Sequence, residues 1–442
     1  MAWVAPAFFA LACLRSPACL TSSLSLRKPT PILIFPIFIL GLLTTELTWF
    51  FLALQALISV GFIALGALGE SLGVVALGLM VINWLGLWRL HLQAHAADDE
   101  LRNALSEELG AGFKDEIPAD RQWVLRDHIV AGEWLRPIAM IRPGVERLED
   151  IAYGDAGERN LLDIYRPTEQ RGSGFPVLLQ VHGGAWYTGH KQQQAMPLLN
   201  HLAARGWICV SINYRLSPDH RFPAHIIDVK KAIHWIRQHV AEYGGNADFI
   251  AITGGSAGGH LTALAALSAN DPAYQPGFET ADTRVDAAVP LYGVYDFVDR
   301  DGKDLNRPLR DFLGHKIMPG SPQEYAELWD QASPVARVHV EAPPFFIIHG
   351  GSDVMTSWEG AQAFSTTLAR VSQNPVAYAK LPGTQHAFDG FHSIRSNYLI
   401  NHVTDFLEWA HSRTLRSRDS APDHPTASGT PGRASAWLGT RP

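Results

Sequence analysis

Cysteine is scarce in this sequence, with three residues among 442. Cys13 and Cys19 lie near the N-terminus, and Cys209 stands alone in an apolar run. Three scattered thiols provide neither the spacing of a zinc site nor the dense, even set of a disulfide-stapled domain. We therefore expect a chain that folds around an ordinary hydrophobic core, with Cys209 inside that core.

Long basic runs are also missing, and the formal net charge is −7, with 36 Lys and Arg against 43 Asp and Glu. Proteins that bind phosphate backbones present clustered positive charge. The sequence therefore predicts that nucleic acid is not a partner.

Charge of either sign is almost absent from residues 29–88, which contain only Glu46 and Glu70. Within this stretch, residues 47–68 and 74–88 form two apolar runs, and a membrane-spanning helix needs about 20 apolar residues. We expect a transmembrane helical hairpin. A buried pair of core helices is the alternative.

The apolar run at residues 31–43 is short for a separate span and suits an interfacial or partly inserted helix. Basic residues precede the hairpin and Arg89 follows it, while the loop between its helices has none. By the positive-inside rule, two spans place the rest of the chain in the cytoplasm, whereas a third span through residues 31–43 would place it outside.

The chain beyond the hairpin shows two successive sequence patterns. Residues 98–109 carry leucines at helical spacing beneath acidic positions, which indicates an amphipathic surface or cap helix. From residue 145, β-rich runs alternate with helical stretches, as in a mostly parallel sheet flanked by helices. The expected strands are residues 161–165, 177–181, 208–213, 249–253, 287–291, 345–349 and 376–380.

These patterns divide the chain into five parts. They are an N-terminal segment (1–30), a membrane-embedded helical region (31–92), an amphipathic linker with cap helices (93–144), an α/β domain (145–412) and a disordered tail (413–442), the tail being rich in Ser, Pro, Gly and Arg.

The motif GGSAG at residues 254–258 follows a β-prone run and precedes the helical stretch 261–267. This is the context of a nucleophile elbow, in which a sharp turn lifts a serine hydroxyl above the sheet. Glycines two positions on either side of Ser256 permit that turn, and the helix N-terminus faces developing negative charge. We predict Ser256 as a nucleophile, with a simple Gly-rich turn as the alternative.

A serine nucleophile needs a base and, in most cases, a carboxylate that orients the base. Asp353 lies in a Gly-rich loop after the apolar run 345–349, and His386 lies in a loop after the next expected strand. The chain order Ser, Asp, His is the order of the α/β-hydrolase fold. Each residue alone is compatible with an ordinary loop position, but together they predict a catalytic triad.

Donors for the oxyanion are expected where the strand at 177–181 opens into paired glycines. The N–H groups of Gly183 and Gly184, with that of Ala257 after the nucleophile, would hold the substrate oxygen. His182 would brace this loop. A metal site at His182 has no carboxylates at ligand spacing, so we expect neither a metal nor an organic cofactor.

Together these motifs resemble the hormone-sensitive-lipase-like carboxylesterases of the α/β-hydrolase superfamily, over about residues 145–412. The resemblance implies oxyanion donors in the first Gly-rich loop, the nucleophile in the serine elbow, and a triad completed by the last Asp and His. It rests on HGGAW at 182–186, NYRLSPDHRFPA at 213–224, Asp228, Trp235, GGSAGGHL at 254–261, HGGSD at 349–353 and the loop with His386.

Two departures from the family pattern bear on substrate more than on mechanism. Ala185 replaces the third glycine of the usual HGGG loop, and Gly255 replaces the more frequent Asp before the nucleophile. The HGGxW form is also similar to arylformamidases and prenylcysteine methylesterases. Tyr214, Arg215 and Asp219 are expected to hold the chain after the fourth strand and to have no chemical role.

We therefore predict a membrane-anchored serine carboxylesterase that acts on carboxylic esters, including lipid-like ones, through an acyl-enzyme on Ser256. An arylformamidase-like amide hydrolase and a catalytically silent, membrane-bound binding module are the alternatives. Acyl preference and oligomeric state stay open. The candidates for an apolar acyl pocket, each of which could equally be a core residue, are Trp123, Trp134, Trp186, Phe297 and Phe312.

Overall fold

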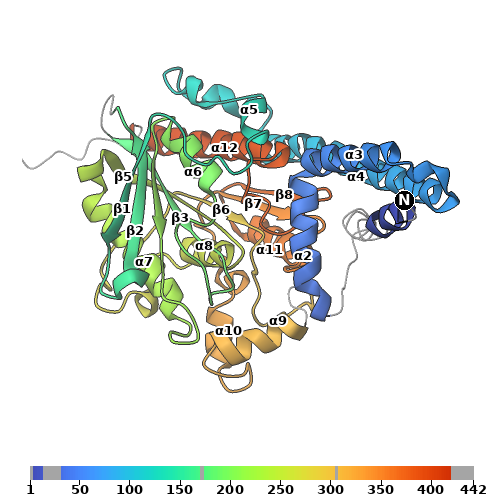
Figure 1. The fold of residues 1–442 in the computed structure, drawn as a ribbon. Helices are drawn as coiled ribbons and strands as arrows, with labels where there is room; N and C mark the ends of the chain where they lie inside the picture. Colours follow the sequence, from blue (N-terminus) through green and yellow to red (C-terminus); the bar gives the residue numbers. More distant parts are fainter. Residues whose placement is uncertain (1–2, 13–30, 170–173, 304–306, 420–442) are drawn as a thin grey trace, which may run out of the picture.

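The centre of the molecule is an eight-stranded sheet (Figure 1). The computed structural model describes residues 3–12, 31–169, 174–303 and 307–419. The strands are β1 (Val145–Ala152), β2 (Leu161–Pro167), β3 (Phe175–Val181), β4 (Ile208–Ile212), β5 (Gly245–Gly255), β6 (Ala287–Leu291), β7 (Phe345–Gly350) and β8 (Val376–Leu381). Their order is β1-β2-β4-β3-β5-β6-β7-β8, and all neighbours from β4 to β8 are parallel.

The seven predicted strands are confirmed, and β1 is the strand that the sequence did not reveal. Its sequence, VERLEDIA, has no apolar run, and its residues are exposed or half-buried. β1 pairs antiparallel with β2 at the edge of the sheet, with a register shift between Leu148 and Ile151. An edge strand with a solvated face needs no continuous apolar pattern, so hydrophobicity alone does not identify it.

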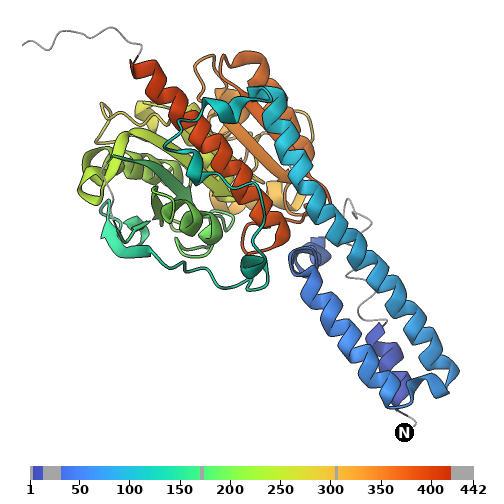
Figure 2. The same ribbon diagram turned by 90° about the horizontal axis from the view of Figure 1, so that it is seen from above.

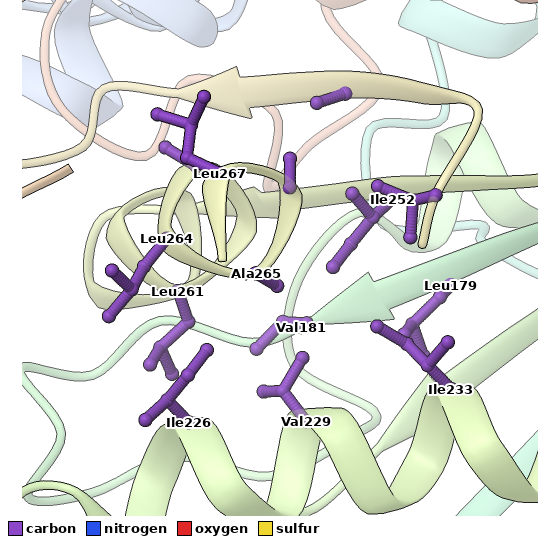
Figure 3. Packing of buried hydrophobic residues seen from close by; sticks show 14 of the residues in the cluster. Leu179, Val181, Ile226, Val229, Ile233, Ile252, Leu261, Leu264, Ala265 and Leu267 are labelled. Carbon is purple, nitrogen blue, oxygen red and sulfur yellow. The ribbon is translucent and has the colours of Figure 1, made fainter. Parts of the chain in front are cut away.

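Helices cover both faces of the sheet. The helices α7 (Ala224–His239), α8 (Ala257–Leu267) and α11 (Trp358–Val371) pack on one face, and α6 (Met196–Ala203) and α12 (Ile394–Asp419) pack on the other. In β5, Ile250 and Ile252 join the first core while Phe249 and Ala251 join the second, which follows from the two-residue period of a strand. Figure 3 shows side chains of α7 and α8 meeting those of β3 and β5.

The N-terminal region contains a short helix at residues 4–12 and the helices α2 (Pro31–Glu46), α3 (Thr48–Ala64) and α4 (Ser71–Leu109). α3 lies beside α4, and the pair projects away from the sheet (Figure 2). By length and composition alone, α4 is one helix able to cross a membrane, and the described residues hold two such spans if α2 and α3, bent by 88°, count as one.

The prediction of separate helices at 74–88 and 98–109 is wrong, because α4 continues through both for 39 residues. The connecting sequence RLHLQAHAA contains neither Gly nor Pro, so nothing in it breaks a helix. The far half of α4 packs on α12 and β8. A single rigid helix therefore joins the apolar hairpin to the domain that contains the sheet.

The predicted tail begins too early. α12 runs to Asp419, and the Arg413 guanidinium donates to the Asn374 side chain at 2.9 Å. Residues 413–419 are therefore helical, while the predictions for 13–30 and 420–442 lie outside the described residues. Cys209 is a free, buried thiol on β4, as expected. The short α-helices outside the N-terminal region are α5 (Ala131–Trp134), α9 (Arg307–Phe312) and α10 (Ala326–Gln331).

Candidate active site

Ser256 occupies the turn between β5 and α8. Its φ of 59° and ψ of −122° are far from both strand and helix values, which is the strained geometry of a nucleophile elbow. A Cβ on either Gly254 or Gly258 would overlap the carbonyl oxygen of Val181 at the end of β3. These two glycines are therefore required by close packing of the elbow against β3, and neither has a positive φ.

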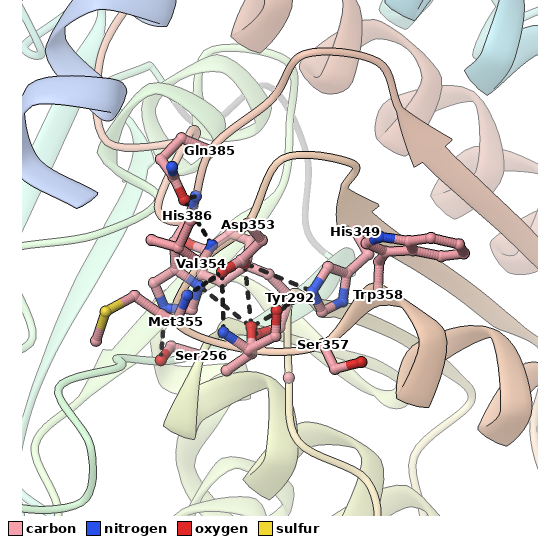
Figure 4. Close-up of polar contacts among 12 residues, drawn as sticks. Ser256, Tyr292, His349, Asp353, Val354, Met355, Ser357, Trp358, Gln385 and His386 are labelled. Atoms are coloured by element: carbon pink, nitrogen blue, oxygen red, sulfur yellow. Dashed lines mark hydrogen bonds and ion pairs between the residues drawn. The ribbon is translucent and has the colours of Figure 1, made fainter. Parts of the chain in front are cut away.

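The three predicted triad residues meet at the carboxyl ends of parallel strands (Figure 4). Ser256 follows β5, Asp353 follows β7 and His386 follows β8. The Ser256 Oγ lies 2.9 Å from His386 Nε2, and His386 Nδ1 lies 2.7 Å from Asp353 Oδ2. One imidazole thus bridges the hydroxyl and the carboxylate, the arrangement that a serine nucleophile requires.

The Asp353 carboxylate is fully enclosed by donors. The backbone N–H groups of Met355 and Thr356 donate to its Oδ1 at 2.8 and 2.9 Å, and the Thr356 hydroxyl donates to Oδ2 at 3.0 Å. Burial alone would raise the pKa of Asp353, but the charges and hydrogen bonds of His386 and His349 bring it below the usual range. Asp353 therefore stays ionised at neutral pH and fixes the imidazole orientation.

The predicted oxyanion loop contributes fewer free donors than expected. The Gly183 N–H donates to Gln194 Oε1 at 2.6 Å, so this N–H group already has an acceptor within the protein. The N–H groups of Gly184 and Ala257 have no hydrogen-bond acceptor in the described part of the chain, so both can donate to a substrate oxygen. Ala185, which replaces a family glycine, has a φ of 55°, a left-handed value that explains why glycine is common there.

Tyr292 and Asp389 belong to the site, although sequence reasoning missed both. The Tyr292 ring lies 4.6 Å from the His386 ring in an edge contact, and its hydroxyl donates to Asp389. Burial raises the pKa of both groups, which favours their neutral forms. A Cβ on Gly255 would overlap the Tyr292 hydroxyl, so an Asp cannot stand before this nucleophile. The only sequence signal is that Tyr292 directly follows a predicted strand.

Two of the three residues that were expected to hold the chain after the fourth strand make the expected contacts, and the third does not. The Tyr214 hydroxyl donates to the His182 carbonyl at 2.9 Å, and the two rings stack at 4.3 Å. Arg215 makes a two-pronged ion pair with Asp228, with nitrogen–oxygen distances of 2.9 and 2.7 Å. Asp219 is exposed, so the expectation that it holds this chain segment is wrong.

The proposed aromatic acyl pocket does not form as a unit. Trp186 and Phe297 are buried against His260, where Trp186 Nε1 donates to His260 Nδ1 at 3.2 Å and Phe297 stacks on the ring. These two are core residues. Trp123 is exposed, and Trp134 lines a small cavity beside Glu46. Phe312 instead packs against Tyr187, five residues after His182, with ring centres 6.1 Å apart.

No group of three or more metal-ligating side chains is gathered anywhere in the described ranges.

A mostly parallel sheet with a strained serine turn after its fifth strand defines the α/β-hydrolase fold. The BD-FAE family model matches residues 162–368. The chain is 44% identical to "Esterase LipQ" of Mycobacterium tuberculosis over 335 residues, which cover 74% of this chain and 77% of LipQ. It is 46% identical to "Probable carboxylic ester hydrolase LipM" of the same organism over 338 residues, which cover 73% and 75% of the two chains.

Among solved structures, esterase B of Lactobacillus rhamnosis superposes with a TM-score of 0.52 at 19% identity, over 62% of this chain and 90% of that one. This likeness supports the fold. Given the relatives' identity and coverage, the chain belongs to the hormone-sensitive-lipase-like carboxylesterases of the α/β-hydrolase superfamily, the family that its motifs predicted.

Proposed function

We propose that this chain is a serine carboxylesterase in which Ser256 is the nucleophile, His386 the general base and Asp353 the residue that orients it. The observation that carries the proposal is the continuous chain of two hydrogen bonds from the Ser256 hydroxyl through His386 to a buried carboxylate. An intact triad of this kind argues against a catalytically silent binding module. The names of the M. tuberculosis relatives favour ester over amide substrates.

The reaction follows from the positions of these atoms. His386 Nε2 takes the Ser256 proton as Oγ attacks the ester carbonyl, and the N–H groups of Gly184 and Ala257 stabilise the oxyanion. The intermediate collapses with transfer of the proton from His386 to the departing alcohol. Water, deprotonated by His386, then attacks the acyl-enzyme carbonyl. The second intermediate collapses with cleavage of the bond to Ser256 Oγ, which takes the proton back from His386 as the carboxylic acid leaves.

The N-terminal hairpin is proposed to anchor the enzyme in a membrane. Large apolar side chains of α3 and α4 point outward, with Leu57 70% exposed and Leu85 64% exposed. The 17 residues of α3 extend about 26 Å, close to the roughly 30 Å of a bilayer core. Trp49 and Trp88 meet edge to face at the base of the hairpin, where aromatic residues mark membrane interfaces.

The distribution of charge supports one side of the membrane for the catalytic domain. Arg89 lies where α4 leaves the apolar hairpin, and the loop at the hairpin tip has no basic residue. We propose that the catalytic domain faces the cytoplasm, with α3 and α4 as the two spans.

The test is hydrolysis of p-nitrophenyl esters of increasing acyl length by the detergent-solubilised full chain. Wild type should hydrolyse them, and Ser256→Ala should lose essentially all turnover. Ser106→Ala, a serine on α4 far along the chain from the triad, is the matched control and should retain full activity. Equal rates for wild type and Ser256→Ala would refute the assignment. Faster cleavage of an N-formyl aryl amide than of any ester would favour the arylformamidase-like function.

A further inference from the structure

α2 lies between the apolar hairpin and the triad. It runs across the base of the α3–α4 pair (Figure 1), and its axis is bent by 88° from that of α3. Because α3 lies along α4, a hairpin that crosses a bilayer places α2 nearly parallel to the membrane plane. α2 is then at the level where the hairpin leaves the lipid and the catalytic domain begins.

The C-terminal end of α2 is fastened to the catalytic domain. Glu46, its last residue, forms a fully buried ion pair with Arg395 of α12 and accepts a hydrogen bond from the Ser393 hydroxyl at 2.7 Å. A buried pair of this kind has a defined geometry and resists displacement. α2 therefore has a fixed position on the domain.

The inner face of α2 touches the triad residue His386 and its neighbour Gln385. The Phe38 ring packs edge-on against the His386 ring, with centres 5.8 Å apart. Gly41 allows close approach to Gln385, because a Cβ there would lie 3.0 Å from Gln385 Nε2. The Gln385 Oε1 in turn accepts the N–H groups of Val354 and His386, each at 3.0 Å. α2 thus contacts the residue that ties the two triad loops together.

The outer face of α2 is apolar and uncovered. Phe35 is 64% exposed and Leu40 is 51% exposed, and Leu33 and Ile39 accompany them. Residues 31–45 contain no charged side chain at all. A water-facing helix normally carries charged residues on its outer face. The absence of charge here, and continuity with the outward-facing apolar surface of the hairpin, fit acyl chains better than water or a charged protein partner.

We propose that α2 lies in the membrane interface, with its outer face in lipid and its inner face against His386, so that bilayer-dissolved esters reach Ser256 along α2. This inference rests on the proposed ester hydrolysis and specifies the substrate class as lipid esters taken laterally from the bilayer. Phe38 would then form the wall between the acyl chains and the catalytic imidazole.

The first experiment uses the full chain reconstituted in phosphatidylcholine vesicles. Rates are compared for dioleoylglycerol within the vesicles and for dissolved p-nitrophenyl butyrate. The double variant Phe35→Gln/Leu40→Gln should lose at least tenfold on the vesicle-borne ester and stay within twofold of wild type on the dissolved one. The matched control, Val340→Gln/Val371→Gln, changes two residues that are 45% and 40% exposed near the amino ends of β7 and β8, and should alter neither rate.

An unchanged vesicle-borne rate in the α2 variant, or an equal loss on both substrates, would overturn the inference. If wild type cleaves the dissolved ester and leaves dioleoylglycerol intact, the inference fails while the proposed function stands. If wild type cleaves neither, the proposed function fails, and the position of α2 is decided by a second experiment that needs no turnover.

That experiment measures depth. A fluorophore on Phe35→Cys, in a background with Cys13→Ser and Cys19→Ser, is quenched by lipids that carry a nitroxide at shallow or deep positions of the acyl chain. Position 35 should be quenched best by shallow nitroxides, Val60→Cys of α3 by deep ones, and Val340→Cys by neither. A label at position 35 that no lipid nitroxide quenches would show that protein, such as a second copy of the chain, or water covers this face, and would overturn the inference.

Discussion

Apolar side chains point in opposite directions in the two regions of this molecule. In the sheet domain they point inward, and residues 176–181 of β3 and 249–255 of β5 are buried on both faces. In the α3–α4 hairpin, large apolar residues such as Leu57 and Leu85 point outward. The same composition therefore has two meanings: a core that excludes water in one region, and a surface suited to lipid in the other.

The regions meet at the carboxyl edge of the sheet, where the triad also lies. The buried Glu46–Arg395 pair and the contact of α2 with His386 join them there. Under the proposed anchoring, the catalytic site would lie at a membrane surface without any change to the strands of the sheet. The predictions below separate the contributions of the two regions.

Breaking the sheet domain alone should have the largest effect. Asp353→Asn removes the charge that orients His386, and the turnover number should fall by about 10⁴-fold, as in other triads. Asp389→Asn is the matched control, because the Asp389 carboxyl accepts a hydrogen bond from the Tyr292 hydroxyl, whereas the Asp353 carboxylate is the one bonded to His386. That variant should lose less than about tenfold. Steady-state kinetics on a dissolved ester measure both. Equal losses would contradict the roles assigned to the two carboxyl groups.

Breaking the joint between the regions should have the next largest effect. Glu46→Ala leaves the Arg395 guanidinium buried without its partner, and the free energy of unfolding should fall by about 3–5 kcal/mol. The double variant Glu46→Leu/Arg395→Met should recover most of this loss, since it leaves no buried charge. Urea unfolding in detergent measures the change.

Glu70→Ala is the control for that joint, because Glu70 is an exposed carboxylate at the hairpin tip. It should alter the unfolding free energy by less than about 0.5 kcal/mol. A Glu46→Ala variant as stable as Glu70→Ala would mean that the two regions are not held together by this pair.

Glycine substitutions in the two regions should change the free energy of unfolding by smaller amounts, and by different amounts in each region. Gly255→Ala would place a Cβ against the Tyr292 hydroxyl and should destabilise the fold by about 1–3 kcal/mol. Adding Tyr292→Val makes room, so the double variant should be more stable than the sum of the single losses. Gly61→Ala in α3 has nothing within 4 Å of the new Cβ and should be neutral or stabilising. Strictly additive losses at positions 255 and 292 would contradict the account of the missing Asp.

The sequence alone predicted the triad because its signals are local. A strand, a Gly-bounded serine and a following helix are contiguous in the chain, and Asp353 and His386 each follow an apolar strand. Chain order and strand ends then place them together. The seven predicted strands were identified for the same reason, since each is a short contiguous run in which apolar residues predominate.

What could not be predicted depends on contacts between distant segments. Tyr292 meets Asp389 across 97 positions of the chain and meets His386 across nearly as many, and no spacing rule connects these residues. The hydrogen bond from the Gly183 N–H to Gln194 depends on the orientation of the Gln194 side chain, which the sequence does not reveal. The edge strand β1 lacks an apolar pattern, and the seating of α2 on Gln385 depends on tertiary packing.

The central claim, that Ser256 is the nucleophile of an active triad, is tested most directly by a fluorophosphonate that reacts with activated serines. The account predicts a one-to-one adduct on intact wild-type protein, located by peptide mass mapping to Ser256, and no adduct on Ser256→Ala. An adduct on another serine, or labelling that persists in Ser256→Ala, would contradict it.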